Sequence, residues 1–570
     1  MPAANAASPL SEGLSSEVAA LAQGAGLTFT MAGWLVRRGL TDPSEVERFL
    51  EPKLQHLTAP EAMVDRDAAA ERLAAAVRGG ERIAVFGDYD CDGITSCAIM
   101  TDALRQLGAE VTPLLASRFS GGYGVTAEAA ERVRSTGATL LVTCDCGSSD
   151  HAVLAGLRQA GVDAVVIDHH LVPAEPLPVV AFLNPNRPEC GFPFKGLASC
   201  GLALSVVAAV RTKLQRALDV RQWLDLVAIG TIADVVSLTG DNRPLVRAGL
   251  TRLQQGGRPG VVALLELARM EATRALTAED VAFRLAPRLN APGRMGPPDL
   301  ALELLLARSH AEARGLAARV EQLQLERRAL QDKMIAEAVD EIERDQLATR
   351  GAIVIGREGW NHGIVGIVAG RLASRYGLPA VVVGFDAGTG VGSARGPAGS
   401  RLYDALAHAK DTVLRFGGHQ AAAGVTVERE RFAQFREAFE HACGALAGEA
   451  AASASDPVVE LHPGDELSRV LADFTRLEPC GQDNPAPLLA VQAQLLVARA
   501  VRGGHLKLEL ELERGRRISG FGPNLGEHAA TLDGHVRVVG RLRPDDYRGA
   551  GAVELKLADA PTRLGDTARV

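Results

Sequence analysis

Acidic residues and histidines stand in this sequence at points where apolar runs stop. The segment Gly87–Gly93 carries Asp88, Asp90 and Asp92 at alternate positions, directly before a helix-length stretch. Three carboxylates so close together repel one another unless a cation neutralises them. An acidic helix cap would use the same residue type, because Asp is common before helices. Taken alone, the segment is compatible with a metal site and with a helix cap.

Three further segments place chemistry-bearing residues in the same way. Asp145 follows an apolar run, Asp168-His169-His170 closes another, and Asp234 ends the segment Gly230–Asp234, with Asp225 as a less favoured acid nearby. The carboxyl ends of parallel strands meet at one edge of an open sheet, where ligands bind. Isolated surface or core histidines would be the alternative for the pair. The combined pattern favours one metal site built from carboxylates and imidazole.

The elements that must position these residues alternate in type. Short apolar runs at 82–86, 109–115, 139–143 and 163–167 are separated by helix-length segments. This alternation is typical of βαβ units and predicts an α/β fold with a parallel sheet. We expect a domain over residues 81–305 that carries the acidic motifs. Residues 1–80 read as a helical cap on that domain.

The rest of the chain reads as three further parts. A helical stretch without Pro over 306–346 would reach about 60 Å at 1.5 Å per residue, so we expect a connector between two lobes rather than a helix packed on one core. A second α/β unit should occupy 347–448. An Ala/Gly/Ser-rich linker follows, and strand-like runs then predict a small β-barrel within 449–570.

Composition limits the classes of protein that fit. The 570 residues suggest three or four domains at about 150 residues each. The net charge of −8, from 61 Lys and Arg and 69 Asp and Glu, argues mildly against nucleic-acid binding unless carboxylates hold cations and basic residues cluster. Eight cysteines without a leader-like start predict a reducing cytoplasm. No apolar run approaches the roughly 20 residues of a membrane span, so no membrane partner is expected.

The motifs also carry a family resemblance. In order and spacing, GDYDCDG, TCDCG, Asp168-His169-His170 and GTIADVV resemble the four motifs of the DHH phosphoesterase superfamily. Segments that resemble the RecJ group within it are Arg118-Phe119 with Gly122-Tyr123-Gly124, Asn184-Pro185-Asn186 and Pro287–Arg294. The resemblance covers nearly the whole chain. It implies a parallel-sheet DHH domain, a DHH-associated domain and a C-terminal oligonucleotide-binding (OB) barrel.

The resemblance implies roles for the motif residues. The ligands of two Mn²⁺ ions, with Mg²⁺ as the alternative, would be Asp88, Asp90, Asp92, Asp145, His169 and Asp234. Asp145 would bridge the ions and act in catalysis. His170 would face the scissile phosphate, and Asp168 would orient His169. Such ions would activate water for hydrolysis of a phosphodiester bond, so the protein need supply no covalent nucleophile.

Substrate contacts are expected in three places. Near the metal site they are Arg118, Arg288, Asn290 and Arg294, each of which could instead be a structural ion-pair partner. In the second unit they are Ser393, Arg395, Gly417, Gly418 and His419, where backbone N–H groups and a guanidinium would hold a phosphate. An ordinary turn is the alternative there, and the resemblance departs at Asn361 and Gly396. In the barrel, the candidates are Arg502, Lys507, Arg516 and Arg517.

The function that the resemblance implies is 5′-to-3′ exonuclease action on single-stranded DNA in repair and recombination. Single-stranded-DNA-binding protein and a helicase would be partners by the same resemblance. Two other functions stay open: a small-substrate phosphodiesterase of the superfamily, and a non-catalytic replication scaffold. The first would not need the barrel. The second would be expected to lose ligands, whereas every acidic position is filled here.

Overall fold

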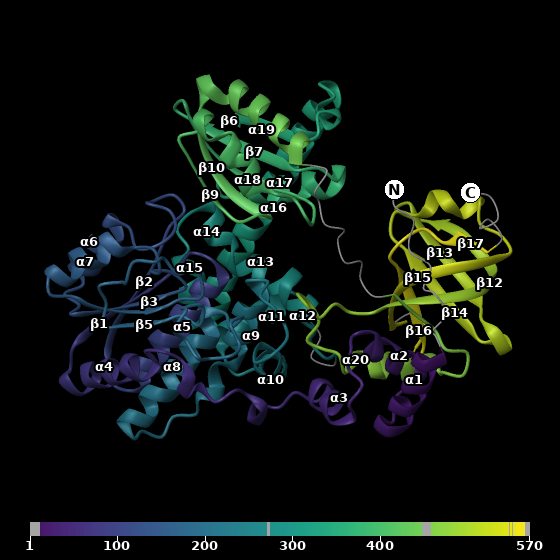
Figure 1. Cartoon of the computed structure of the whole chain (residues 1–570), viewed down its shortest axis with the longest axis horizontal. Helices are drawn as coiled ribbons and strands as arrows, with labels where there is room; N and C mark the ends of the chain where they lie inside the picture. The colour runs from purple at the N-terminus through teal and green to yellow at the C-terminus, as the bar shows by residue number, and fades with distance from the viewer. Residues whose placement is uncertain (1–11, 271–273, 447–457, 546–547, 550, 565–570) are drawn as a thin grey trace.

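The structure is a computed structural model, and it describes residues 12–270, 274–446, 458–545, 548–549 and 551–564. Figure 1 shows an N-terminal α/β lobe, a second α/β lobe above it, and a β-barrel to one side. Among the described residues, no single helix is long and apolar enough to cross a membrane. Ser16–Ala25 and Phe29–Arg37 meet that test only together, as a pair bent by 117°.

The first lobe is built on a five-stranded parallel sheet in the order β2-β1-β3-β4-β5. Its strands are β1 (Arg82–Gly87), β2 (Glu110–Leu115), β3 (Leu140–Cys144), β4 (Asp163–Ile167) and β5 (Ala181–Leu183). The helices that cover it are α4 (Arg66–Gly79), α5 (Cys91–Gln106), α6 (Ala127–Ser135), α7 (His151–Gln159) and α8 (Ser199–Leu214). The predicted parallel sheet is confirmed.

Side chains of β1 show why this strand is apolar throughout. Ile83 and Val85 point to the face covered by α4, α5 and α8, whereas Ala84 and Phe86 point to the face covered by α6 and α7. Successive residues of a strand alternate between faces, so a sheet covered on both sides needs apolar residues at every position. This burial fixes the register and therefore the place where each strand ends.

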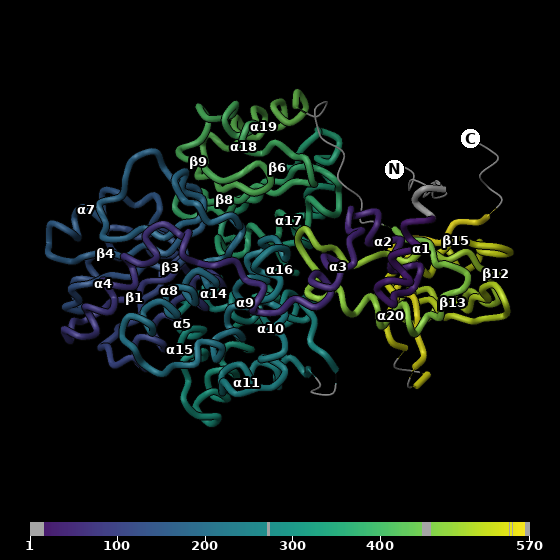
Figure 2. Tube along the Cα trace, turned by 60° about the horizontal axis from the view of Figure 1, so that its bottom comes forward, coloured from purple at the N-terminus to yellow at the C-terminus, as the bar shows by residue number. Residues whose placement is uncertain are grey.

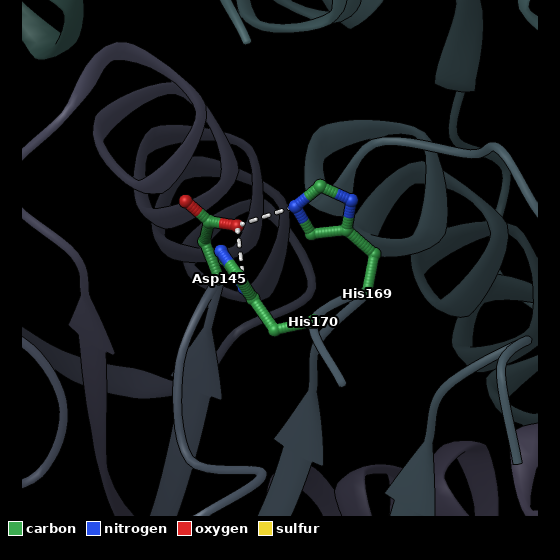
Figure 3. A group of neighbouring side chains, drawn as sticks. All are labelled: Asp145, His169 and His170. Atoms are coloured by element: carbon green, nitrogen blue, oxygen red, sulfur yellow. Dashed lines mark ion pairs between the residues drawn. The ribbon is translucent and has the colours of Figure 1, made fainter. Parts of the chain in front are cut away.

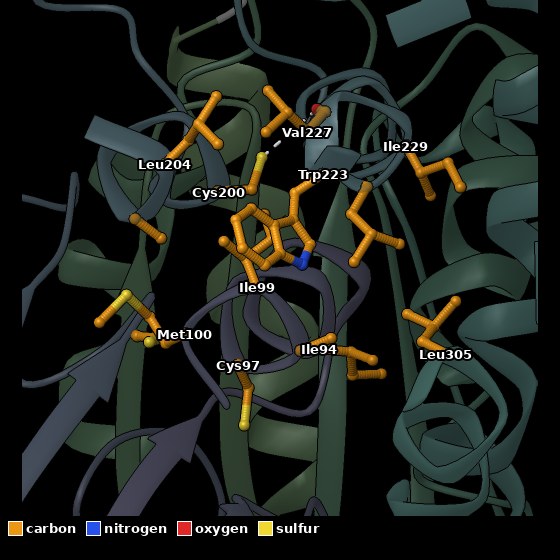
Figure 4. Packing of buried hydrophobic residues seen from close by; sticks show 14 of the residues in the cluster. Ile94, Cys97, Ile99, Met100, Cys200, Leu204, Trp223, Val227, Ile229 and Leu305 are labelled. Atoms are coloured by element: carbon orange, nitrogen blue, oxygen red, sulfur yellow. Dashed lines mark hydrogen bonds between the residues drawn. The ribbon is translucent and has the colours of Figure 1, made fainter. Parts of the chain in front are cut away.

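The core of this lobe continues into α9 (Leu224–Ala233). Figure 4 shows Trp223 beside Ile99 of α5 and Val227 of α9. Close packing of α9 depends on Gly230, because an added Cβ would lie 2.3 Å from Thr95 Oγ1 and 2.7 Å from Cys200 Sγ. The apolar run before Asp234 is therefore a helix, and α9 rather than a strand carries the fourth acidic motif to the site.

A series of helices leads to the connector. They are α10 (Asn242–Gln255), α11 (Pro259–Leu267), α12 (Ala278–Asp280), α13 (Ala286–Leu289), α14 (Ala291–Met295), α15 (Asp299–Leu306) and α16 (His310–Arg344). Helix α16 has 35 residues, close to the predicted stretch. It buries Ala317 and Val320 in the first lobe, and Met334 and Ile342 in the second lobe. The predicted connector between two lobes is confirmed.

The second lobe has a mixed sheet in the order β6-β7-β8-β10-β9. Its strands are β6 (Ile353–Glu358), β7 (Ala380–Asp386), β8 (Thr389–Arg395), β9 (Arg415–Gly418) and β10 (Ala422–Glu428). Only β6 and β7 run parallel, and the other pairs are antiparallel. The helices are α17 (Val365–Tyr376), α18 (Leu402–His408) and α19 (Phe432–Leu446).

The C-terminal strands close into a barrel. They are β12 (Leu488–Val501), β13 (His505–Glu511), β14 (Arg517–Gly522), β16 (Val553–Leu557) and β15 (His535–Pro544), in that order around the sheet. Pairing between β12 and β15 closes the ring, so five strands form the barrel that the sequence predicts. The short strands β11 (Val458–Glu460) and β17 (Thr562–Arg563) extend it, and α20 (Leu467–Thr475) packs beside it.

The first three helices do not cap the first lobe as the sequence suggested. Helices α1 (Glu12–Ala25), α2 (Phe29–Arg37) and α3 (Pro43–Leu50) share one apolar core with the barrel, and only α4 joins the first lobe. Thr28 donates two hydrogen bonds of 2.8 Å to the Asp473 carboxylate, and Thr30 donates two of 2.7 Å to Asp465. Apolar periodicity shows that a helix is buried, but it does not identify the surface that buries it.

One buried arginine fixes the barrel and the N-terminal helices to the first lobe. Arg243 of α10 donates to the carbonyl oxygens of Phe49 (2.8 Å), Leu477 (2.9 Å) and Pro479 (3.2 Å). Its residue is 3% exposed, and burial lowers the pKa of this guanidinium to about 10. The tube view in Figure 2 places α3 between α10 and the barrel. The three parts of the chain therefore meet at a single charged side chain.

Candidate metal centre

The acidic motifs converge at the carboxyl edge of the first sheet. Strands β1 and β3 are neighbours, and the chain leaves them toward opposite sides of the sheet, with β2 on one side and β4 on the other. A ligand site is expected at such a switch point. Asp88 follows β1, Asp145 follows β3 and Asp168 follows β4. Chain segments separated by up to 80 residues therefore deliver carboxylates to one place.

Asp90 and Asp92 are held by helix starts. Asp90 is the N-cap of α5 and accepts hydrogen bonds from the N–H groups of Asp92 (3.0 Å) and Gly93 (3.1 Å), so the helix-cap interpretation holds for this residue. Asp92 accepts from the N–H groups of Ser199 (2.7 Å) and Cys200 (3.0 Å) in the first turn of α8. Two helix dipoles therefore point their positive ends at the acidic cluster.

Asp145 lies at the centre of the cluster. It is 1% exposed, and its backbone has φ of 65°, which is strained for a residue with a side chain. Its Oδ1 accepts a 3.0 Å hydrogen bond from Ser199 Oγ. The same oxygen lies 3.2 Å from His169 Nε2 and 3.8 Å from His170 Nδ1 (Figure 3). Strain at a residue that binds several groups is typical of a functional site.

Asp168 organises the histidine pair. Its carboxylate accepts from the N–H groups of Ser148 (3.1 Å), His169 (2.8 Å) and His170 (3.2 Å), and lies 2.8 Å from His170 Nδ1. Although burial raises it, these bonds hold the pKa of Asp168 below its ordinary value. Burial lowers the pKa of His170, but the contact with Asp168 outweighs it and raises that pKa to about 9. Asp168 thus orients the ring of His170 rather than that of His169, which corrects the prediction.

The donor set fits divalent cations. Ligand atoms lie within 4.8 Å of one another in three groups, which are Asp145-His169-His170, Asp92-His169-Asp234 and Asp88-Asp90-Asp145. His169 Nε2 and Asp88 Oδ1 are buried and make no hydrogen bond with any described residue, as expected of atoms that bind a metal. Mixed carboxylate and imidazole donors suit Mn²⁺, and the carboxylates suit Mg²⁺. Asp145 belongs to two groups, so it could be shared between two ions.

The electrostatics of the cluster agree with this fit. Burial, followed by the neighbouring carboxylates, raises the pKa of Asp145 well above its ordinary value and that of Asp234 to about 9. Burial likewise raises the pKa of Asp88 well above the ordinary value. Burial lowers the pKa of His169, which favours the neutral imidazole that binds metal. A bound cation would offset both the burial and the mutual repulsion that raise these carboxyl pKa values.

Three predicted substrate arginines meet between the two lobes. Arg118 stacks on the Tyr89 ring at 3.9 Å, Arg294 Nη1 donates to the Gly363 carbonyl (3.0 Å), and Arg395 Nη1 donates to Ser393 Oγ (2.7 Å). Burial and then the charge of Arg118 lower the pKa of Arg294 to about 9, and the same causes lower that of Arg395. None of the three has an ion-pair partner within the described part of the chain. We call Arg118, Arg294 and Arg395 the interlobe arginines.

Other predicted substrate residues lie differently. Arg288 is 8% exposed and forms a double hydrogen bond with Glu321 of α16 (2.6 and 3.0 Å), so it has the structural role that the sequence left open. Asn290 joins α13 to α14 and is partly buried. Gly417 lies in register with Gly424 of β10, which is in register with Ser393. Gly418 ends β9, and His419 follows it and is exposed.

The barrel candidates also divide. Lys507 pairs with Glu554 at 3.1 Å, and Arg516 donates to the carbonyl oxygens of Asp465 and Pro463, so both side chains serve the barrel itself. Arg517 is exposed, with Glu511 3.9 Å away.

Sequence reasoning missed two residues that contact the cluster. Ser199 is the first residue of α8, and no spacing rule links it to Asp145, which lies 54 residues earlier. The Tyr123 hydroxyl donates to the Asp145 carbonyl oxygen (3.3 Å) and lies 3.0 Å from His170 Nδ1. Tyr123 belongs to the Gly122-Tyr123-Gly124 segment, which carries family resemblance but no chemical pattern of its own. Its position between two glycines in an exposed loop was the only available signal.

Comparison with known proteins gives a consistent result. Residues 82–231 match the DHH family N-terminal domain, 347–445 the DHHA1 domain, and 459–559 the RecJ OB domain. The chain is 34% identical to the single-stranded-DNA-specific exonuclease RecJ of Bacillus subtilis over 543 residues, which are 94% of this chain and 68% of that protein. It is 35% identical to the Escherichia coli protein of the same name, over 91% of this chain and 93% of that one.

Solved structures give the same family. The fold matches RecJ from Thermus thermophilus in complex with Mn²⁺ with a TM-score of 0.81 at 30% identity, over 96% of this chain and 78% of that one. It also matches exonuclease RecJ bound to manganese with a TM-score of 0.61 at 33% identity, over 69% of this chain and 99% of that one. By sequence, by domain order and by fold, this chain belongs to the RecJ family.

Proposed function

We propose that this chain is a single-stranded-DNA-specific exonuclease that hydrolyses phosphodiester bonds from the 5′ end with two divalent ions. One observation carries the proposal: a carboxylate and histidine cluster lies beside three interlobe arginines that have no carboxylate within ion-pair distance among the described residues. Anionic strands need cations on both sides of the reacting phosphate. The relatives named RecJ support the substrate and the reaction.

Residues of both lobes would position the end of the DNA strand for hydrolysis of one phosphodiester bond. The interlobe arginines would hold the terminal phosphate by forked, charge-assisted hydrogen bonds, and Arg118 would link that group to the metal side through its contact with Tyr89. Asp88, Asp90, Asp92, Asp145, His169 and Asp234 would hold two ions, either Mn²⁺ or Mg²⁺. When bound, divalent ions lower the pKa of a water nucleophile and neutralise charge on the phosphate.

Asp168 and His170 complete the proposed reaction centre. His170 is cationic near neutral pH because of its contact with Asp168, so its charge faces the same space as the carboxylate cluster. The backbone of both histidines is fixed further by Asn186 Nδ2, which donates to the His169 carbonyl oxygen (2.6 Å), and by Asn184 Nδ2, which donates to that of His170 (2.9 Å). Such rigidity is what catalysis by orientation requires.

A polymeric substrate agrees with the rest of the chain better than a dinucleotide does. The barrel is joined to the first lobe through the carbonyl contacts of Arg243, and OB barrels bind single strands. We further propose a role in DNA repair and recombination in the cytoplasm, where all eight cysteines would stay reduced as they are here. Single-stranded-DNA-binding protein and a helicase are the proposed partners, on the family resemblance alone.

The test uses end-labelled single-stranded and double-stranded DNA with Mn²⁺, Mg²⁺ or chelator. We expect metal-dependent loss of label from the 5′ end of single strands, and a decrease of at least about a hundredfold in Asp145→Ala, the size expected when a main electrostatic contributor is removed. Asp163→Asn is the matched control, because Asp163 begins β4 at the opposite edge of the sheet. Equal activity of Asp145→Ala and the native chain would refute the proposal.

A further inference from the structure

A second basic hollow lies at the far end of α5 from the metal cluster. Asp92 is in the first turn of α5, and Asp102 and Arg105 are near its end, so about 15 Å of helix separates the two places. The hollow has a volume of about 190 Å³ and is formed where α5, the link between α10 and α11, and the link before α16 come together. Figure 2 shows α5, α10, α11 and α15 on this side of the first lobe. None of its lining residues belongs to the metal cluster or to the interlobe arginines.

The lining carries more positive than negative charge. Four arginines line it, which are Arg105, Arg252, Arg258 and Arg308, and we call the hollow the arginine pocket. Arg258 is held by Asp225, with Nε donating at 3.1 Å. Within the described part of the chain, the other three have no carboxylate within ion-pair distance. Burial and the neighbouring charge of Arg308 lower the pKa of Arg105, which places these two cations close together.

The one carboxylate of the lining is held by neighbouring side chains, one of which is Arg258 of the pocket itself. Asp102 accepts a 2.8 Å hydrogen bond from Trp223 Nε1, whose indole is fully buried at the centre of the core in Figure 4. Asp102 also accepts from Gln106 (3.2 Å) and lies 3.7 Å from Arg258. Arg105 donates one of its N–H groups to the Val111 carbonyl oxygen (2.9 Å), and its other N–H groups, together with Arg252 and Arg308, are left to bind an anion.

A larger hollow of about 670 Å³ adjoins the arginine pocket, since Gln222 and Arg252 line both. Its lining includes the apolar side chains of Leu54 and Leu224. It also includes the basic side chains of Lys53, Arg221 and Arg247 and the acidic side chain of Asp219. This volume is within the range of small-molecule sites. Both hollows are therefore basic, and the larger one also offers apolar surface to the organic part of a ligand.

We propose that the arginine pocket binds a phosphate group, with the organic part of the ligand in the adjoining hollow. Guanidinium groups match phosphate oxygens by paired, charge-assisted hydrogen bonds. A free 5′-mononucleotide and the backbone of a DNA strand present the same group. An exonuclease that removes one terminal nucleotide per cut releases a 5′-mononucleotide, and the inference rests on the proposed function only for this source of ligand.

The test measures binding of thymidine 5′-monophosphate, thymidine and a short oligothymidylate by calorimetry. The full chain carries Asp145→Asn and is kept in chelator, so that no hydrolysis occurs. We expect the monophosphate to bind and thymidine not to bind. Arg105→Gln and Arg252→Gln should each weaken binding about tenfold, as the loss of one charge-assisted hydrogen bond does. Arg158→Gln, an exposed arginine of α7, is the control and should bind as the parent does.

The outcomes separate this inference from the proposed nuclease. Binding that survives both pocket substitutions but is lost in Arg395→Gln would place the phosphate between the lobes and overturn the inference. Equal binding of thymidine and its monophosphate would also overturn it. A loss of oligothymidylate binding in both pocket variants that exceeds their loss of monophosphate binding would identify DNA as the source of the phosphate. Arg308→Gln, an exposed position, replaces Arg105→Gln if the latter does not fold. Because the assay needs no hydrolysis, either proposal can fail without the other.

Discussion

Replacing Asp145 with an asparagine should separate metal binding from folding. Ligand oxygens of Asp88, Asp90 and Asp145 lie within 4.8 Å of one another. At an effective dielectric constant of about 20, two unit charges at that distance repel by about 3.5 kcal/mol, which exceeds the roughly 1.4 kcal/mol of one pKa unit. Burial and this repulsion should therefore both favour the protonated form of Asp145 in metal-free protein, in agreement with its raised pKa. The amide side chain is then a close copy of the metal-free carboxyl group.

The magnitude follows from linkage. Mn²⁺ at one hundred times its dissociation constant stabilises the native chain by about 2.7 kcal/mol. For a lobe of this size, that corresponds to a rise in Tm of about 5–10 °C. The amide oxygen of the substituted side chain can still accept the hydrogen bond from Ser199 Oγ, so we expect Asp145→Asn to melt close to the native chain without metal. The Tm of this variant should respond little to Mn²⁺.

Differential scanning calorimetry of the native chain, Asp145→Asn and the control Asp163→Asn, with chelator and with Mn²⁺, measures both effects. Two results would refute the reasoning. One is a full Mn²⁺ shift in Asp145→Asn, which would show that Asp145 does not bind the ion. The other is a large loss of Tm in metal-free Asp145→Asn, which would show that the ionised carboxylate stabilises the fold.

Three further predictions use other parts of the structure. Because the pKa of Asp234 is raised to about 9, the stability of the metal-free protein should fall as pH rises from the ordinary carboxyl range toward 9. The Mn²⁺-induced rise in Tm should therefore be larger at pH 8.5 than at pH 6. An equal rise at both pH values would contradict this. Gly230→Ala should reduce nuclease activity at least about tenfold, because the added Cβ would lie 2.9 Å from Asp92 Oδ1. Full activity in the end-label assay would contradict this, since it would show that α9 can shift without disturbing the metal centre. Arg243→Met should lower the unfolding free energy by at least about 3 kcal/mol, because three hydrogen bonds to carbonyl oxygens are lost. It should also reduce nuclease activity on long single strands more than on short ones. Calorimetry and a series of substrate lengths test this, and an unchanged Tm would contradict it.

The part of the site that rests on strand ends could be predicted from the sequence. Asp88, Asp145 and Asp168 follow apolar strands, and parallel strands deliver their ends to one edge for general topological reasons. Asp234 was predicted from its motif, although a helix carries it. Its place depends on Gly230, whose tight packing against α5 and α8 is a tertiary property.

Contacts between distant elements could not be predicted. Arg288 sits in a basic, family-like motif, but its charge is matched by Glu321 on α16, and pairing across helices leaves no local pattern. The docking of α1–α3 on the barrel depends on Asp465 and Asp473, which lie more than 400 residues away. Local periodicity reports burial, whereas the choice of partner is set by shape and by hydrogen bonds formed only in the folded chain.

The distribution of apolar and polar residues along α16 bears on how the second lobe can move relative to the first. Between its two apolar anchorages, the helix buries Gln324, Arg327 and Gln331, where Arg327 donates to both amide oxygens (2.9 and 2.7 Å). Sliding the rod lengthwise would expose hydrocarbon at both ends. Bending at the middle of α16 would replace the hydrogen bonds between Arg327 and the two glutamines with hydrogen bonds to water. It would leave the apolar contacts at both ends of the helix unchanged. We therefore expect the second lobe to tilt by bending of the polar middle of α16 rather than by sliding of the whole helix.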